Sequence, residues 1–107
     1  MALSHDSRQT VSERIEGDPA FAKVLLDEAA TLFLNGEPDR ARLVLRDLVN
    51  ATVGFEILAR LTERPSKSLH PMLSSNGNPS MDNLAVIFAA LRDGLKVEIQ
   101  VHTADAA

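Results

Sequence analysis

The sequence has no cysteine, no tryptophan and no tyrosine. Without thiols it has neither disulfides, nor cysteine-ligated zinc, nor a thiolate nucleophile, which agrees with a reducing compartment. No apolar run approaches the length of a membrane span, and the first residues lack the apolar core of a signal peptide. We therefore expect a cytoplasmic protein without a membrane partner.

Residues typical of catalysis are equally scarce. His5, His70 and His102 stand in three separate contexts without a carboxylate at ligand spacing, so we predict no metal site and no cofactor. The chain has no glycine-rich phosphate loop and no nucleophile elbow. Asp27 and Glu28 fit a solvated helix face better than an acid–base pair. We predict that the protein is not an enzyme.

Positive charge is also in short supply. The chain has 11 basic and 15 acidic residues, a formal net charge of −4. Residues 54–93 contain four of each and are neutral, whereas residues 1–53 contain six basic and nine acidic residues. Nucleic-acid-binding proteins usually present a basic face. If residues 54–93 bind DNA, each subunit should bind only modestly, because phosphate neutralisation supplies most non-specific affinity.

The length of 107 residues fits one domain. Residues 1–16 have no apolar period and are predicted to form a flexible N-terminal arm, which leaves residues 17–107 as the domain. The domain should begin with a helical hairpin. Its first helix would be capped by Asp18 before Pro19 and would stop at Asn35-Gly36; a second helix would run from Pro38 to about residue 51.

Residues 54–93 have the pattern of a helix-turn-helix followed by a supporting helix. A helix over residues 55–62 should direct Leu58 and Leu61 inward, and Arg64 to Ser66 should break it. The next helix is predicted to start at Ser66 or Ser68, with that serine as its cap, and to end near residue 73. After a turn-rich loop, Ser80 should cap a last helix that ends at residues 93–94.

The final segment changes period. Leu95, Val97, Ile99 and Val101 alternate with polar residues, which predicts a β-strand over residues 95–101. A lone strand leaves its backbone hydrogen-bonding groups unpaired. We therefore expect it to pair with the same strand of a second copy, giving a homodimer.

Several short elements occur in an order shared with a known family. They are Asp18-Pro19, Asn35-Gly36, Leu45-Arg46-Asp47-Leu48-Val49, Ala51-Thr52, Gly54-Phe55, Leu58-Ala59-Arg60-Leu61-Thr62, Arg64-Pro65, Lys67-Ser68-Leu69, Met72-Leu73, Gly77-Asn78-Pro79, Asn83-Leu84 and Leu91. In this order the chain resembles antidote proteins of HigA-type toxin–antitoxin modules and related transcriptional regulators. The resemblance implies an all-α, five-helix lambda repressor-like helix-turn-helix domain. It also implies an operator in double-stranded DNA, repression of the protein's own operon, and a partner toxin that cleaves RNA.

The predicted DNA-binding residues lie in and around the second helix of the motif. They are Arg64, Ser66, Lys67, Ser68, His70, Ser75, Asn76 and Asn78. Basic and hydroxyl side chains suit phosphates and base edges, whereas a solvated polar turn is the alternative for each residue singly. Turn chemistry alone also explains the asparagines of the loop.

Two residues depart from the family pattern. Glu63 stands where relatives usually have glycine, and it would place a Cβ in a left-handed turn if that geometry is kept. Pro71 stands where many have arginine, and it suits the helix only if the helix starts at Ser68. These departures and the acidic balance favour a rival hypothesis, a protein-interaction module on the same scaffold with weak or lost DNA binding.

Overall fold

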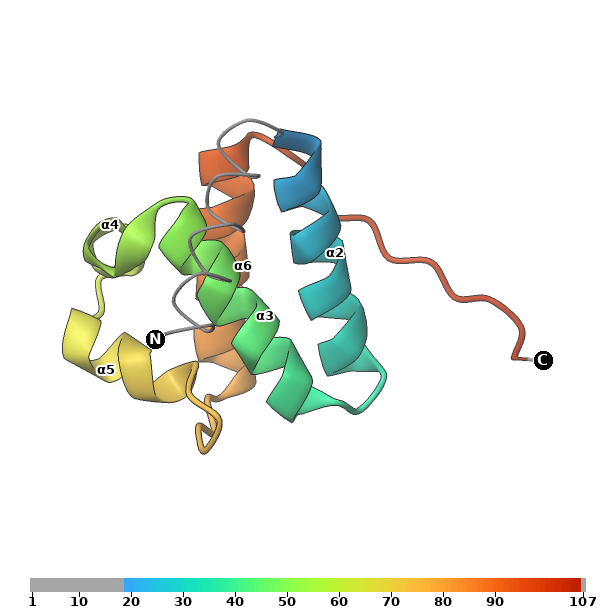
Figure 1. Cartoon of the computed structure of the whole chain (residues 1–107), viewed down its shortest axis with the longest axis horizontal. Coiled ribbons are helices and arrows are strands. Elements are labelled where there is room, and N and C mark those ends of the chain that lie inside the picture. The colour runs from blue at the N-terminus through green and yellow to red at the C-terminus, as the bar shows by residue number, and fades with distance from the viewer. Residues whose placement is uncertain (1–18, 107) are drawn as a thin grey trace, which may run out of the picture.

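The computed structural model describes residues 19–106, which fold into five α-helices without a β-strand (Figure 1). The helices are α2 (Pro19–Leu34), α3 (Pro38–Ala51), α4 (Gly54–Thr62), α5 (Ser66–Met72) and α6 (Met81–Leu95). None of the helices in this range is long and apolar enough to cross a bilayer. The all-α class predicted from the sequence is confirmed.

The predicted hairpin is formed by α2 and α3, which pack against each other. Gly36 has a φ of +84° in the turn, so a residue without a Cβ ends α2 at little cost. Pro38 is the first residue of α3, where its missing N–H is not needed. The Asp18 cap and the flexible arm over residues 1–16 lie outside the described residues.

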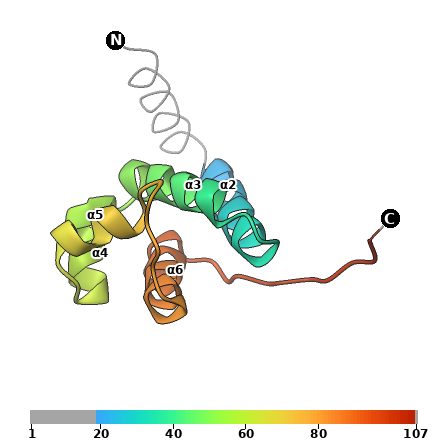
Figure 2. The same cartoon turned by 90° about the horizontal axis from the view of Figure 1, so that it is seen from below.

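The core lies between α3 and α6, with contributions from every helix. Its fully buried large side chains are Leu45, Leu48, Val49, Leu58, Leu69, Leu73, Ile87 and Leu91. In both views the α4–α5 pair lies on one side of α3 and α6, and α2 lies on the other side (Figures 1 and 2). The fold therefore presents α5 and α2 on opposite flanks.

Two expectations about side-chain direction were wrong. Leu61 was expected to point inward but is 53% exposed, whereas Thr62 is buried and its hydroxyl donates to Leu58 O at 2.7 Å. The buried stripe of α4 follows Phe55, Leu58 and Thr62, and Leu61 lies on its flank. Arg42 was expected to face outward, yet only 6% of it is exposed.

The last helix extends beyond its predicted end. Gly94 does not stop α6, which continues to Leu95 and ends where Lys96 adopts a left-handed conformation with φ +57°. The N–H of Lys96 donates to the carbonyls of Arg92 and Asp93, so the last turn is capped without a glycine. Leu95 is therefore helical and does not belong to the predicted strand.

The rest of the predicted strand has no regular secondary structure, because the described part of the chain offers it no strand to pair with. Its alternation is nevertheless present. Val97 and Ile99 are half-buried against the core, whereas Glu98 and Gln100 are exposed. Beyond them the chain extends away from the helices (Figures 1 and 2).

Candidate nucleic-acid interface

The start of α5 is set by Pro65 and not by a serine side chain. Pro65 has extended backbone angles, φ −63° and ψ 140°, and its carbonyl accepts hydrogen bonds from Ser68 N at 2.9 Å and Leu69 N at 3.2 Å. No side chain caps the helix. Of the two predicted starts Ser66 is right as a boundary, but the predicted serine cap is wrong, because the backbone of Pro65 takes that role.

One face of α5 is open to solvent. Lys67, His70 and Pro71 are exposed, at the three- and four-residue spacing that brings side chains together on a helix. Leu69 on the opposite face is fully buried. Ser66 and Ser68 are half-buried on the flanks. Lys67 is the one lysine or arginine of α5, so the positive charge of this face depends on it.

His70 connects the exposed face to the neighbouring helix. Its ring stacks on the ring of Phe55 in α4, with centroids 3.9 Å apart and planes 20° from parallel. His70 nevertheless remains exposed, and Phe55 is buried. The stacking restricts the imidazole to one orientation at the surface, while its edge remains open to form hydrogen bonds.

Arg64 lies in the turn between α4 and α5 and is half-buried. Its Nε donates to Asn83 Oδ1 at 2.6 Å, and its Nη1 donates to Thr62 O at 2.8 Å. Because Asn83 belongs to the first turn of α6, Arg64 links the start of α5 to the supporting helix. Other N–H groups of its guanidinium remain for an external acceptor.

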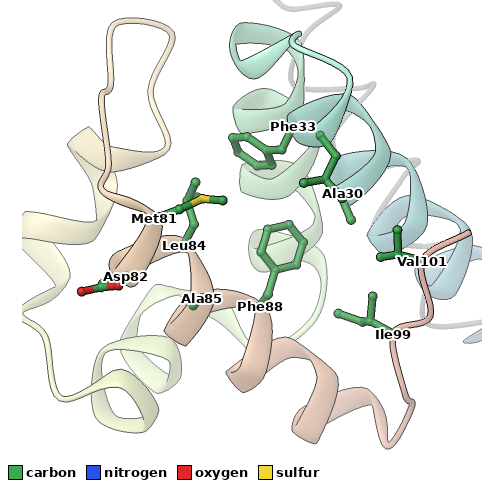
Figure 3. A pocket seen from close by; sticks show the side chains of 10 residues that line it. Ala30, Phe33, Met81, Asp82, Leu84, Ala85, Phe88, Ile99 and Val101 are labelled. Atoms are coloured by element: carbon green, nitrogen blue, oxygen red, sulfur yellow. The ribbon is translucent and has the colours of Figure 1, made fainter. Parts of the chain in front are cut away.

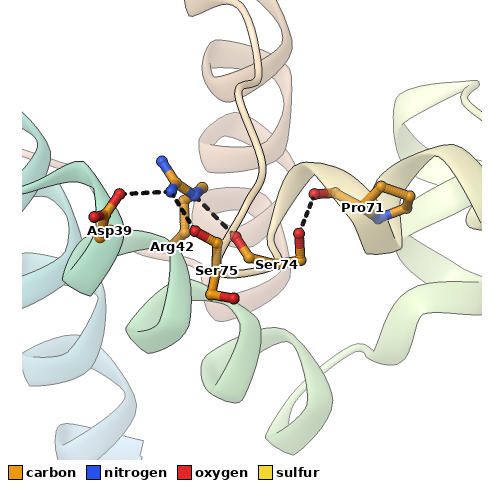
Figure 4. Close-up of polar contacts among 5 residues, drawn as sticks. All are labelled: Asp39, Arg42, Pro71, Ser74 and Ser75. Carbon is orange, nitrogen blue, oxygen red and sulfur yellow. Dashed lines mark hydrogen bonds and ion pairs between the residues drawn. The ribbon is translucent and has the colours of Figure 1, made fainter.

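The loop after α5 presents three of the predicted residues. Ser75, Asn76 and Asn78 are exposed. The loop is held from below by Arg42 of α3, whose Nε donates to Ser74 O at 2.9 Å and whose Nη2 donates to Ser75 O at 3.0 Å (Figure 4). A charged donor therefore satisfies two loop carbonyls from within the protein.

Two further contacts keep the loop close to the end of α5. Arg42 is itself oriented by an ion pair between its Nη2 and Asp39 Oδ1 at 2.7 Å (Figure 4). Gly77 lies so close to α5 that a Cβ on it would be 2.5 Å from the carbonyl oxygen of Pro71 and closer still to that of Met72. Only glycine allows this approach, so the loop backbone is packed directly on the helix end.

Both departures from the family pattern have structural consequences. Glu63 has φ +56° and ψ 38°, the left-handed conformation anticipated for it, and its N–H donates to Ala59 O as the cap of α4. Its carboxylate is exposed beside the candidate interface. Pro71 is the sixth residue of α5 and not in its first turn, because the helix starts at Ser66. Pro71 therefore leaves the carbonyl of Lys67 without its usual helical donor.

The eight predicted residues thus fall into one continuous strip, formed by the turn before α5, the exposed face of α5 and the loop after it. Sequence reasoning missed Arg42 and Asn83, which hold the two ends of this strip. The spacing of Asp39 and Arg42 indicated an ion pair within one helix turn. It carried no information about loop carbonyls more than thirty residues away.

No group of three or more histidines or acidic residues within residues 19–106 is arranged to hold a metal ion. Comparisons with protein-family models, with curated proteins and with solved structures gave no match for this chain. The assignment of a function therefore rests on the residues of the strip and on the order of short sequence elements.

Proposed function

We propose that the protein is a cytoplasmic, sequence-specific DNA-binding regulator in which α4 and α5 form the helix-turn-helix and α5 is the recognition helix. One observation carries the proposal: the exposed face with Lys67 and His70 is held at both ends by buried arginine hydrogen bonds. A helix that enters the major groove needs such a fixed orientation, because base edges are recognised by geometry.

Within this proposal the residues have different roles. Lys67 reaches a guanine edge or a phosphate, and His70 contacts the neighbouring position along the groove. Ser75, Asn76 and Asn78 contact the phosphate backbone through side-chain and loop N–H groups, which sets the register of α5 on the duplex. Arg64 acts mainly through Asn83 and is a positioning residue.

The resemblance in the order of sequence elements supports a more specific proposal, an antitoxin-like autorepressor that also binds a toxin protein. This part is tested separately from DNA binding. The frame adjacent to its gene is co-expressed with the protein, and copurification of that product together with relief of its toxicity supports the antitoxin role. Free toxicity in the presence of the full chain contradicts it.

DNA binding is tested by fluorescence anisotropy with DNA from the region upstream of the gene and with a scrambled duplex. Lys67→Ala should weaken binding to the specific duplex by about 1–3 kcal/mol if Lys67 contacts a base. If Lys67 contacts only a phosphate, both duplexes should lose affinity similarly and the salt dependence should fall by about one per contact.

Lys23→Ala is the matched control, because Lys23 is an exposed lysine on α2, on the opposite flank of the molecule. It removes the same charge but should not change the preference between the two duplexes. Equal losses for Lys67→Ala and Lys23→Ala would show that only net charge matters. Equal binding of the wild-type protein to both duplexes at low salt would refute the proposed function.

A second function, a protein-interaction module, is favoured by the outer surface of α4. Ile57 is 41% exposed and Leu61 is 53% exposed, one helical turn apart on a helix that also carries the acidic cap Glu63. Leu61→Ser should leave DNA affinity within about twofold under the regulator proposal, since a neutral exposed side chain contributes little to phosphate binding. It should reduce toxin binding if this ridge is a protein contact.

A further inference from the structure

The flank opposite α5 contains an apolar groove of about 400 Å³ between the last turns of α2, the first turns of α6 and the C-terminal segment (Figure 3). Phe33 and Phe88 meet edge to face inside it, with ring centroids 5.9 Å apart. Ile99 and Val101 of the C-terminal segment form one side of the groove. Asp82 is the one charged residue among those that line it.

This groove gathers a large share of the exposed apolar surface. Leu34, Met81 and Val101 line it and are 59%, 72% and 64% exposed. They are three of the six large apolar side chains that are exposed within residues 19–106. A contiguous apolar patch of this kind is typical of an interaction site, whereas single exposed apolar residues are ordinary.

The segment beside the groove has the backbone of an unpaired strand. Within the described residues, the backbone of residues 98–101 forms no hydrogen bond to another part of the chain. Its apolar residues face the groove and its polar residues face solvent. It therefore offers both unsatisfied backbone donors and acceptors and an apolar face, which together suit the addition of a second strand.

We propose that the occupant is a second copy of this chain, and that residues 97–101 of the two copies pair antiparallel across a two-fold axis at Ile99. Each strand then lies beside the groove of the other copy and covers Leu34 and Met81. The two-fold arrangement is closed, so no edge or groove remains open for further copies.

The side chains of the segment select this register. Pairing about Ile99 places Val97 opposite the partner's Val101, so apolar residues meet on the face toward the groove, and places Glu98 opposite the partner's Gln100. These two types already bond within one chain, where Gln100 Nε2 donates to Glu98 Oε1 at 3.0 Å. Pairing about Glu98 would instead place two carboxylates directly opposite each other, which is destabilising.

The inference does not depend on the proposed function, because it concerns the flank opposite α5 and its test uses no DNA. The full chain is expected to be a dimer at micromolar concentration in light scattering. Leu34→Lys should weaken the dimer by at least about tenfold, because it places a charge in an apolar contact. Lysine near the end of α2 suits the helix dipole, so the helix itself should not be weakened.

Val24→Lys is the matched control, because Val24 is also 59% exposed and lies on the same helix but outside the groove. It should leave the dimer constant within about twofold, as expected for a surface change away from the contact. Equal effects of the two substitutions would overturn the assignment of the groove. A full-length protein that is monomeric throughout the micromolar range would overturn the proposal and leave the groove to a different partner.

The register is tested with single cysteines, which are unambiguous because the chain has none. Only a residue on the two-fold axis lies opposite its own copy, within the 4.4–6.8 Å between Cα atoms that a disulfide typically spans. Oxidation should therefore cross-link Ile99→Cys, but neither Glu98→Cys nor Gln100→Cys. Cross-linking at position 98 or 100 in place of 99 would overturn the proposed register.

Discussion

Glu63 provides a direct test of how the turn before α5 is built. It adopts φ +56° as the cap of α4, although it has a Cβ and its carboxylate lies at the negative end of the helix dipole. Glu63→Gly removes both unfavourable features and leaves the backbone hydrogen bond to Ala59 in place. We expect this substitution to stabilise the protein.

The magnitude follows from three effects. Release of a non-glycine residue from the left-handed region gains about 1–2 kcal/mol. The greater freedom of glycine in the unfolded chain costs about 0.5–1 kcal/mol. Removal of an acidic residue from a helix C-terminus gains about 0.3–1 kcal/mol. The net result is about 1 kcal/mol of added stability, or a melting temperature about 4–8 °C higher for a domain of this size.

Lys96→Gly is the matched control, because Lys96 caps α6 with φ +57° and ψ 49°, nearly the geometry of Glu63. It gains and loses the same conformational terms but removes a charge that favours the helix C-terminus. We expect it to change the free energy of unfolding by less than about 0.5 kcal/mol. Urea denaturation followed by far-UV circular dichroism measures both variants, since the protein has no tryptophan.

The comparison has two ways to fail. Destabilisation by Glu63→Gly would contradict the assigned strain at this turn. Equal stabilisation by both variants would keep the strain but contradict the role given to the charge. If α5 binds DNA, Glu63→Gly should also increase affinity for every duplex, because it removes a negative charge near the phosphates.

Two further substitutions test how the loop after α5 is held. Gly77→Ala should destabilise the protein by about 1–3 kcal/mol, because the added Cβ meets backbone oxygens of α5 that cannot move aside; an unchanged midpoint in urea denaturation would contradict the close approach. Arg42→Met should cost about 2–4 kcal/mol, because two loop carbonyls lose a charged donor. It should also accelerate amide exchange in the loop, whereas Arg40→Met, which removes only the exposed ion pair with Glu37, should cost less than about 1 kcal/mol.

Signals that act within a few residues predicted most of the helical fold. Pro38 and Gly36 have restricted or unusual backbone preferences of their own, so the start of α3 and the turn before it were predictable from the sequence. The end of α6 was misplaced because a glycine usually stops a helix, whereas here Lys96 takes the left-handed position two residues later. A residue with a Cβ gives no sequence signal for that conformation.

The candidate interface was predictable in outline but not in its support. Lys67 and His70 follow from helical spacing around the buried Leu69. The burial of Arg42 depends on a loop that reaches it only in the folded chain, and the contact between Arg64 and Asn83 joins residues 19 positions apart. No local pattern specifies such contacts. The C-terminal strand likewise depends on a pairing partner that one chain does not contain.

The order of helix contacts has a consequence for how the protein forms. Between Pro19 and Leu95 the main contacts join α2 to α3, α3 to α4 and α4 to α5, which are neighbours along the chain, and α4 to α6. Short connections and local contacts lower the entropy lost in loop closure and favour folding in microseconds to milliseconds. The groove between α2 and α6, however, exists only after the last helix has docked. Self-association through that groove would therefore follow folding, so incompletely synthesised chains would lack the surface with which to pair.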